Sequence, residues 1–331
     1  MKIAPPLKNW SLAFLSVILT VAAVELCLRT GLIKTTLSKR LTVEGPSAPS
    51  HKLLILGDSF IYKSGELDRL LLPKLNSLNF QTLNLAVEGL GPMEYLAELK
   101  AFGLRYKPDI ILLGYYVGND LTNVGYKMDW DQGWRGALRP FVRGTHLYHL
   151  VHNFENRIAE HSFDFEHFKQ AGIDPEVVES AKKGQLNFYF LSLAEAHPDF
   201  LMDNLLMEGS SNELAWLKVK AILKQIKMLS DSIDSKLVLV IFPESLQISP
   251  SHREYYQKFR FNVSRGLLGS SKPQAFMMEF CKEMRIGCLD LLPFFRLRSE
   301  ELFQKDDPHF NLNGNKLSAA LIAEFLSKSY A

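Results

Sequence analysis

Short, almost wholly apolar runs alternate with amphipathic stretches from residue 51 to the end of the chain. Runs of this kind, closed by glycine or polar residues, are typical of strands buried on both faces of a parallel sheet. The longest amphipathic stretch, 212–235, has apolar residues at helical spacing and leads directly into an apolar run. The candidate strands are residues 52–56, 82–87, 109–117, 236–242 and 286–289, and a last helix is expected over 313–327. We therefore predict an α/β fold, a three-layer α/β/α sandwich around a doubly wound parallel sheet.

The amino terminus adds a second constraint. Residues 10–28 form a run of nineteen residues with a single charge, Glu25. As a helix this run would be about 28 Å long, close to the hydrocarbon thickness of a bilayer. We predict an uncleaved signal anchor, a transmembrane helix within residues 1–33; a cleaved signal peptide and a buried core helix are the alternatives. Basic residues flank the run on both sides, so the charge count does not decide its orientation.

The rest of the chain divides into a linker and one large domain. Residues 34–50 are expected to be a linker, because their second half is rich in Pro and Ser, and residues 51–331 are expected to fold as the domain. Within the domain, residues 121–211 separate the third strand from the long helix by far more than an ordinary connection. This insertion is rich in aromatic residues, which favours either a cap over a site or a helical insert with its own small core. The histidines at 146, 149 and 152 are interpreted as a solvated helix face and not as a metal site.

Composition excludes several classes of protein. A net charge of +2 is too balanced for an electrostatic nucleic-acid binder, so no nucleic-acid partner is expected. Three cysteines are too few for a disulfide scaffold, and none lies in a cluster with zinc-ligand spacing. We therefore expect no metal and no organic cofactor. Cys281 and Cys288 could form a disulfide or remain two buried thiols, and the sequence leaves this open.

Polar residues follow three successive candidate strands. Gly57-Asp58-Ser59-Phe60 ends the first, the segment from Asn84 to Gly89 ends the second, and Gly118-Asn119-Asp120 ends the third. Each segment alone is more often a turn than a site. The carboxyl ends of parallel strands meet at one edge of a sheet, where ligands bind, so the three together predict a functional site.

A fourth polar segment lies near the carboxyl terminus and contains His309. Two carboxylates precede it, Asp306 and Asp307. We expect Asp306 to contact the imidazole across a tight turn, because Asp307 directly precedes Pro308 and is biased to an extended conformation. A carboxylate, an imidazole and a serine hydroxyl in a line are what nucleophilic attack on a carbonyl requires.

These four segments resemble the sequence blocks of the SGNH (GDSL-type) hydrolases, in the family's order, over roughly residues 52–326. The resemblance implies an SGNH/flavodoxin-like sandwich and a site whose members are the nucleophile Ser59, the Asp306–His309 pair, and the oxyanion donors Ser59 N–H, Gly89 and Asn119, with Gly91 as the fallback for Gly89. It also implies a structural role for Asp58. The chain departs from the family pattern at Phe310, where many relatives have proline. The G-x-S-x-G elbow of α/β-hydrolases is absent, which argues against that fold.

The resemblance implies a serine esterase that removes O-acyl groups, with O-acetyl groups favoured, from an envelope glycan or a lipid through an acyl-enzyme on Ser59. Two alternatives stay open: a glycan O-acetyltransferase that uses the same residues, and an inactive polysaccharide-binding or assembly module. By the same resemblance we expect a single-pass protein of a bacterial inner membrane with its catalytic domain outside the cytoplasm. Its expected partners are the acylated substrate and the membrane. The sequence does not identify any protein partner, and this question stays open.

Overall fold

The computed structural model describes residues 16, 19–24, 27, 41–125, 164–183, 186, 188–305 and 307–330. The predicted anchor lies mostly outside these residues, as do residues 126–163 of the insertion, which include the histidines at 146, 149 and 152. Among the described residues, no helix is long and apolar enough to cross a membrane. The sheet and the candidate site belong to one compact unit made of residues 43–131 and 164–331.

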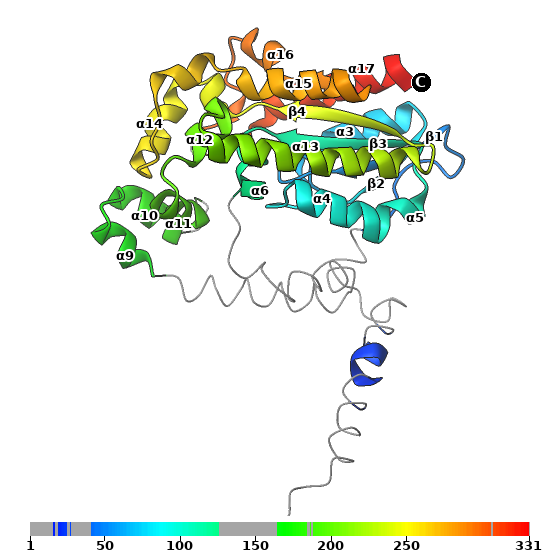
Figure 1. The fold of residues 1–331 in the computed structure, drawn as a ribbon, viewed down its shortest axis with the longest axis horizontal. Coiled ribbons are helices and arrows are strands. Elements are labelled where there is room, and N and C mark those ends of the chain that lie inside the picture. Colours follow the sequence, from blue (N-terminus) through cyan, green and yellow to red (C-terminus); the bar gives the residue numbers. More distant parts are fainter. Residues whose placement is uncertain are drawn as a thin grey trace, which may run out of the picture. The chain divides into compact units, whose positions relative to one another are not determined.

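Five parallel strands form the central sheet, in the order β2-β1-β3-β4-β5 (Figure 1). They are β1 His51–Leu56, β2 Phe80–Asn84, β3 Ile110–Tyr116, β4 Lys236–Phe242 and β5 Gly287–Asp290. β3 is buried along its whole length, and β4 along all but its first residue. This burial explains why both strands read as continuous apolar runs. The predicted α/β class and all five candidate strands are confirmed, with no strand end displaced by more than three residues.

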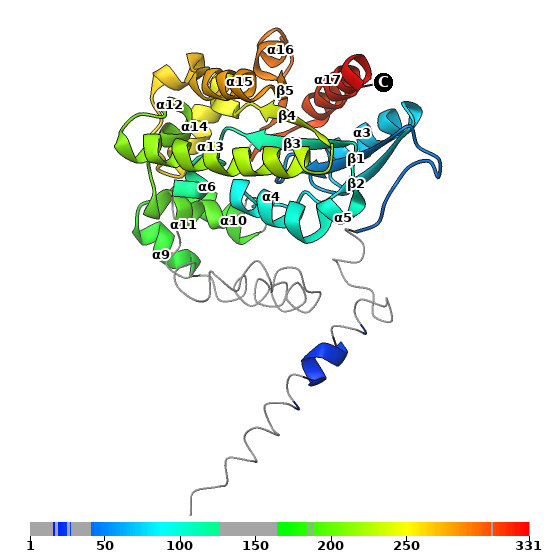
Figure 2. The same ribbon diagram turned by 45° about the vertical axis from the view of Figure 1, so that its right-hand side comes forward.

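Helices cover both faces of the sheet (Figures 1 and 2). One face carries α3 Glu66–Ser77, α16 Leu292–Arg296 and α17 Leu312–Tyr330. The other carries α4 Pro92–Glu98, α13 Ser210–Asp231 and α15 Lys272–Met284. α13 and α15 lie side by side, with the rings of Trp216 and Phe276 edge to face at 5.7 Å. After α4 the chain forms a π-helical turn, Leu99–Gly103, and then the short α5, Leu104–Tyr106.

The described part of the insertion is mainly helical. It consists of α6 Thr122–Gly125, α9 Phe165–Gln170, α10 Pro175–Lys182, α11 Tyr189–Ala196 and α12 Phe200–Leu206. α14, Pro250–Lys258, follows β4. An antiparallel pair, β6 Phe303–Gln304 with β7 Asp307–Phe310, precedes α17 and was not predicted. β6 has two residues and β7 four, too few for the polar–apolar alternation of β7 to identify a strand, and β7 carries His309.

The segment expected to be a free linker is hydrogen-bonded to the edge of the sheet. Glu44 and Thr82 exchange both backbone hydrogen bonds, at 2.9 and 2.7 Å, as an antiparallel bridge on β2. The Glu44 carboxylate pairs with Lys63 at 3.1 Å, and Gln81 donates to the carbonyl oxygen of Pro46 at 3.0 Å. The ordered unit therefore includes residues 43–50, and these cover the outer edge of β2.

A chain that begins at residue 51 is expected to melt a few degrees below one that begins at residue 43. It loses the Glu44–Thr82 bridge, and two backbone hydrogen bonds contribute about 1–3 kcal/mol in total. Thermal unfolding followed by circular dichroism measures the difference. Both chains lack the apolar segment, so it does not confound the comparison. Equal melting temperatures would show that the docked segment adds nothing to stability.

Candidate active site

Four chain segments meet at the carboxyl edge of the sheet around one cavity. The cavity has a volume of about 870 Å³. Its wall includes Ser59 after β1, Gly89 after β2, Asn119 after β3, and His309 in β7. α11 and α12 supply an apolar side to the same cavity, with Phe190, Leu193, Ala196, Phe200 and Leu201. The structure thus brings together the segments that the sequence places far apart.

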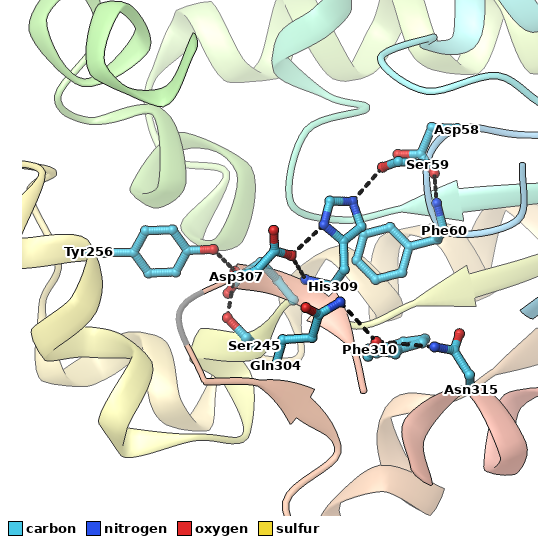
Figure 3. A network of polar contacts seen from close by, with 11 residues as sticks. Asp58, Ser59, Phe60, Ser245, Tyr256, Gln304, Asp307, His309, Phe310 and Asn315 are labelled. Atoms are coloured by element: carbon cyan, nitrogen blue, oxygen red, sulfur yellow. Dashed lines mark hydrogen bonds and ion pairs between the residues drawn. The ribbon is translucent and has the colours of Figure 1, made fainter. Parts of the chain in front are cut away.

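Ser59, His309 and Asp307 form a continuous hydrogen-bonded chain. The Ser59 hydroxyl lies 2.7 Å from Nε2 of His309, and Nδ1 of His309 lies 2.5 Å from Oδ1 of Asp307. Figure 3 shows the imidazole between the serine and the carboxylate. With the proton on Nδ1 donated to Asp307, Nε2 is free to accept the proton of the serine hydroxyl. This arrangement can generate a serine nucleophile.

The carboxylate in this chain is Asp307, which corrects the expectation that Asp306 would fill the position. Asp306 itself lies outside the described residues. Pro308 favours an extended conformation at Asp307, and in the tight turn expected from the sequence this conformation argues against that residue. In a strand, however, residues two apart point to the same side, so extension places Asp307 beside the His309 ring. The same oxygen of Asp307 also accepts from the backbone N–H of His309 at 2.7 Å.

Aromatic packing fixes the position of the His309 ring. Phe60, the residue after the nucleophile, stacks against the imidazole with centroids 5.0 Å apart, and its other contacts include Phe310 at 4.9 Å. Asn315 donates to the carbonyl oxygen of Phe310 at 3.1 Å and ties β7 to α17. Phe310 is 3 % exposed, so the residue that departs from the family pattern is part of the core beneath the histidine.

Asn119 is held beside the Ser59 loop. Its Nδ2 donates to Oδ2 of Asp58 at 3.4 Å, and its Oδ1 is buried without a hydrogen-bond partner among the described residues. Gly118 precedes it, and a Cβ at Gly118 would collide with the ring and hydroxyl of Tyr116. The loop therefore requires glycine at 118. One Nδ2 hydrogen of Asn119 is engaged with Asp58, and the second is available to an anionic oxygen.

Gly89 lies on the cavity wall with a φ of +72°, and a Cβ there would meet open space. Its exposed backbone is suited to close approach by a ligand. Gly91, the fallback, is the residue before the first turn of α4 and begins that helix. The oxyanion roles of the Gly89 and Ser59 N–H groups remain predictions.

Two buried side chains support the nucleophile loop. Oδ1 of Asp58 accepts from the N–H of Phe60 at 3.0 Å, and burial raises the Asp58 pKa to about 6. Asn84, at the end of β2, donates to the carbonyl oxygen of Ile61 at 2.9 Å and to Asp68 at 2.8 Å. These contacts hold the loop from both sides, which fits the structural role expected for Asp58.

A second buried network lies beyond Asp307 and was missed from the sequence. Glu244, two residues after β4, is fully buried and accepts from the hydroxyls of Tyr256 at 2.7 Å and Ser245 at 3.0 Å. Burial raises the pKa of Glu244. A Pro-Glu-Ser sequence after an apolar run was the available signal, and it is too common to single out.

The charges around the Asp307–His309 pair favour a basic histidine. Burial alone would lower the pKa of His309, but the hydrogen bond and charge of Asp307, with the charges of Asp58 and Glu88, outweigh it and raise the pKa. Burial would raise the pKa of Asp307, and the hydrogen bond and charge of His309 outweigh it and lower the pKa. Both shifts favour an ionised carboxylate next to the imidazole.

The acid limb of the kcat/KM profile is therefore expected to have its midpoint above pH 6.5, the ordinary value for histidine. The base must be neutral, and a raised pKa means that the neutral form appears only at higher pH, so activity rises through that pKa. Ester hydrolysis measured between about pH 5 and 9 gives the profile. Glu88→Gln removes one negative charge near the ring and is expected to move the limb to lower pH. A midpoint at or below 6.5 in the unmodified protein would contradict the assignment.

The expectation of a site without metal or organic cofactor stays a prediction. Among the described residues, no group of three His, Cys, Asp or Glu side chains is placed to hold a metal ion. Cys281 and Cys288 are joined by a disulfide that links α15 to β5, which resolves the alternative left open by the sequence.

Comparison with known proteins gives similarities of fold. No family model matches the chain, and no curated protein matches it. Solved structures similar to it include a lipase/acylhydrolase from Enterococcus faecalis (12% identity, TM-score 0.41, covering 84% of this chain and 95% of that one). A GDSL-like lipase from Bacteroides thetaiotaomicron has 9% identity and a TM-score of 0.43, with 92% and 98% of the two chains covered. A catalytic mutant of an acetylxylan esterase from Geobacillus stearothermophilus has 11% identity and a TM-score of 0.42, with 84% and 95% covered. We take no residue role from these similarities.

Proposed function

We propose that this protein is a serine ester hydrolase that acts through an acyl-enzyme on Ser59. The observation that carries the proposal is the chain of contacts Ser59–His309–Asp307, at 2.7 and 2.5 Å, on the wall of a cavity. A lone serine or histidine is common on protein surfaces. A serine, an imidazole and a carboxylate in hydrogen-bonded order at the carboxyl edge of a parallel sheet form a nucleophile with its base.

In the first half of the reaction, Oγ of Ser59 attacks the carbonyl carbon of the ester and its proton passes to Nε2 of His309. The tetrahedral intermediate collapses, the bond from carbon to the alcohol oxygen breaks, and His309 returns the proton to the leaving alcohol. In the second half, water attacks the acyl carbon and gives a proton to Nε2 of His309. The bond from carbon to Oγ of Ser59 then breaks, His309 returns the proton to Oγ, and the carboxylic acid leaves. Asp307 keeps the imidazole in the required tautomer and stabilises its positive charge.

The oxyanion of each intermediate would be held by the N–H groups of Ser59 and Gly89 and by the amide of Asn119. Asn119 is the best supported of the three, because its amide is packed against the nucleophile loop through Asp58. Donors fixed before the reaction stabilise a developing charge without further reorganisation.

We propose an O-acyl group on an envelope glycan or a lipid as the substrate, with O-acetyl as the first class to test. The cavity of about 870 Å³ is far larger than an acetyl group requires, so it has room for the rest of a glycan or lipid substrate as well. Its apolar side from α11 and α12 suits an acyl chain or the flat face of a sugar ring.

We also propose that the chain is anchored in a bacterial inner membrane by residues 10–28, with the site outside the cytoplasm. The apolar run supports the anchor. The Cys281–Cys288 disulfide supports an oxidising compartment, because disulfides rarely persist in the cytosol.

Product analysis tests the reaction class. The protein is incubated with a chromogenic acetyl ester, with and without an oligosaccharide acceptor, and free acetate and acetylated acceptor are both measured. If the protein is a hydrolase, it releases as much free acetate with the acceptor as without it. Acetylated acceptor with little free acetate would instead identify a transferase. A folded protein that turns over neither short nor long acyl esters would favour the binding module.

A further inference from the structure

Tyr116, the last residue of β3, joins the two loops that carry the nucleophile and Asn119. Its ring stacks on Phe60, the neighbour of Ser59, with centroids 4.1 Å apart. Its carbonyl oxygen accepts from the N–H groups of Asn119 at 3.4 Å and Asp120 at 3.1 Å. Both its side chain and its backbone are thus fixed relative to the candidate oxyanion site.

Tyr116 is a buried residue whose side chain lines the cavity, and its hydroxyl is not used by the protein. Tyr116 is 6 % exposed and lines the cavity, and within the described part of the chain its hydroxyl has no hydrogen-bond partner. The other two tyrosines on the wall are engaged: Tyr256 donates to Glu244 at 2.7 Å, and Tyr62 bonds to Glu88. A phenol hydroxyl that lines a cavity without a protein partner is available to donate a hydrogen bond to a ligand.

The surroundings of this hydroxyl place it beside Asn119 and keep it protonated. A Cβ at Gly118 would collide with the Tyr116 hydroxyl, so the oxygen lies against the backbone of the residue before Asn119. Burial, with the charges of Glu244 and Asp58, raises the pKa of Tyr116 well above its ordinary value. The phenol is therefore a neutral donor at every pH at which the protein is expected to work.

We propose that the Tyr116 hydroxyl donates a hydrogen bond to the carbonyl oxygen of the bound ester as that oxygen becomes negative. This makes Tyr116 a catalytic residue additional to Asn119, and the inference rests on the proposed ester hydrolysis. The amide of Asn119 is shared with Asp58, which leaves one of its two Nδ2 hydrogens for the oxyanion. A second side-chain donor, from the end of β3, would supplement it.

Tyr116→Phe is the test, because it removes one oxygen atom and keeps the stacked ring. We expect kcat to fall by about 10²-fold with little change in KM, since the bond strengthens only as charge develops. Inhibition by a boronic acid, which forms a tetrahedral adduct on the serine, is expected to weaken by a similar factor. Because the hydroxyl has no partner in the free protein, the melting temperature is expected to equal or exceed that of the unmodified protein.

Tyr106→Phe is the matched control. Tyr106 is half-buried, and its hydroxyl donates to the carbonyl oxygen of Gln81 at 2.9 Å, away from the cavity. This variant is expected to keep kcat and to lose a little stability, the reverse of Tyr116→Phe. Activity loss together with a lowered melting temperature in Tyr116→Phe would indicate a structural role and overturn the inference.

The outcomes separate the two proposals. An active unmodified protein with kcat unchanged in Tyr116→Phe overturns the role of Tyr116 and leaves the ester hydrolase intact. A raised KM at constant kcat also overturns it, because the hydroxyl would then bind the ground state and the transition state equally. A folded unmodified protein that hydrolyses no ester overturns the proposed function and this inference with it.

Discussion

Asp307→Asn is expected to lower kcat by about 10⁴-fold while leaving the fold intact. The carboxylate accepts the Nδ1 proton of His309 at 2.5 Å and so directs the lone pair of Nε2 to Ser59. An amide at this position can donate to Nδ1, which favours the tautomer that carries its proton on Nε2. That tautomer cannot accept the serine proton. Steady-state ester hydrolysis measures the loss, and near-ultraviolet circular dichroism reports whether the fold is kept.

Asp306→Asn is the control for this prediction, because it makes the same chemical change one residue away. It is expected to keep kcat close to that of the unmodified protein, since Asp307 already occupies Nδ1. The reverse pattern, a large loss in Asp306→Asn and little in Asp307→Asn, would restore the assignment expected from the sequence and contradict the geometry.

Ser59→Ala is expected to reduce turnover further, by up to about 10⁶-fold, because no covalent intermediate can form. The hydroxyl is the group that contacts Nε2 of His309 at 2.7 Å. Ser192→Ala, on α11, removes another serine hydroxyl from the wall of the same cavity and serves as the control. We expect that variant to retain most of the activity. Comparable losses in both variants would mean that the cavity shape, and not a serine nucleophile, limits the reaction.

The sheet could be predicted mainly from its central strands, which are buried on both faces and read as continuous apolar runs. β3 and β4 are the clearest cases. The order of the strands places the ends of β1, β2 and β3 side by side, which is why three polar segments far apart in the sequence could be assigned to one site. The Ser59–His309 contact was expected from the resemblance to the SGNH hydrolases and not from the strand order, because His309 lies in β7, outside the parallel sheet.

The partner of His309 could not be predicted with the same reasoning. The choice between Asp306 and Asp307 depends on whether the segment is a tight turn or a strand, and the four alternating residues of β7 are too few to identify a strand. Pro308 biases Asp307 to an extended conformation, and in a tight turn this conformation would disfavour Asp307 as the partner of His309. In the strand that forms, the same restriction puts the carboxylate and the ring on one side.

The roles of Tyr116 and of the docked segment 43–50 could not be predicted from the sequence either. Tyr116 ends a strand in which every residue is buried, so nothing in its pattern distinguishes it from a core aromatic. Residues 43–50 are rich in Pro and Ser, which is typical of linkers, yet one antiparallel bridge on β2 is enough to hold them. Both depend on neighbours that are distant in sequence.

Covalent labelling with a fluorophosphonate, followed by peptide mapping, tests the central claim most directly. We predict one adduct per folded chain, on the peptide that contains Ser59, absent in Ser59→Ala and formed much more slowly in His309→Gln. A folded protein that takes up no label, or that carries it on another residue, would contradict a nucleophile at Ser59.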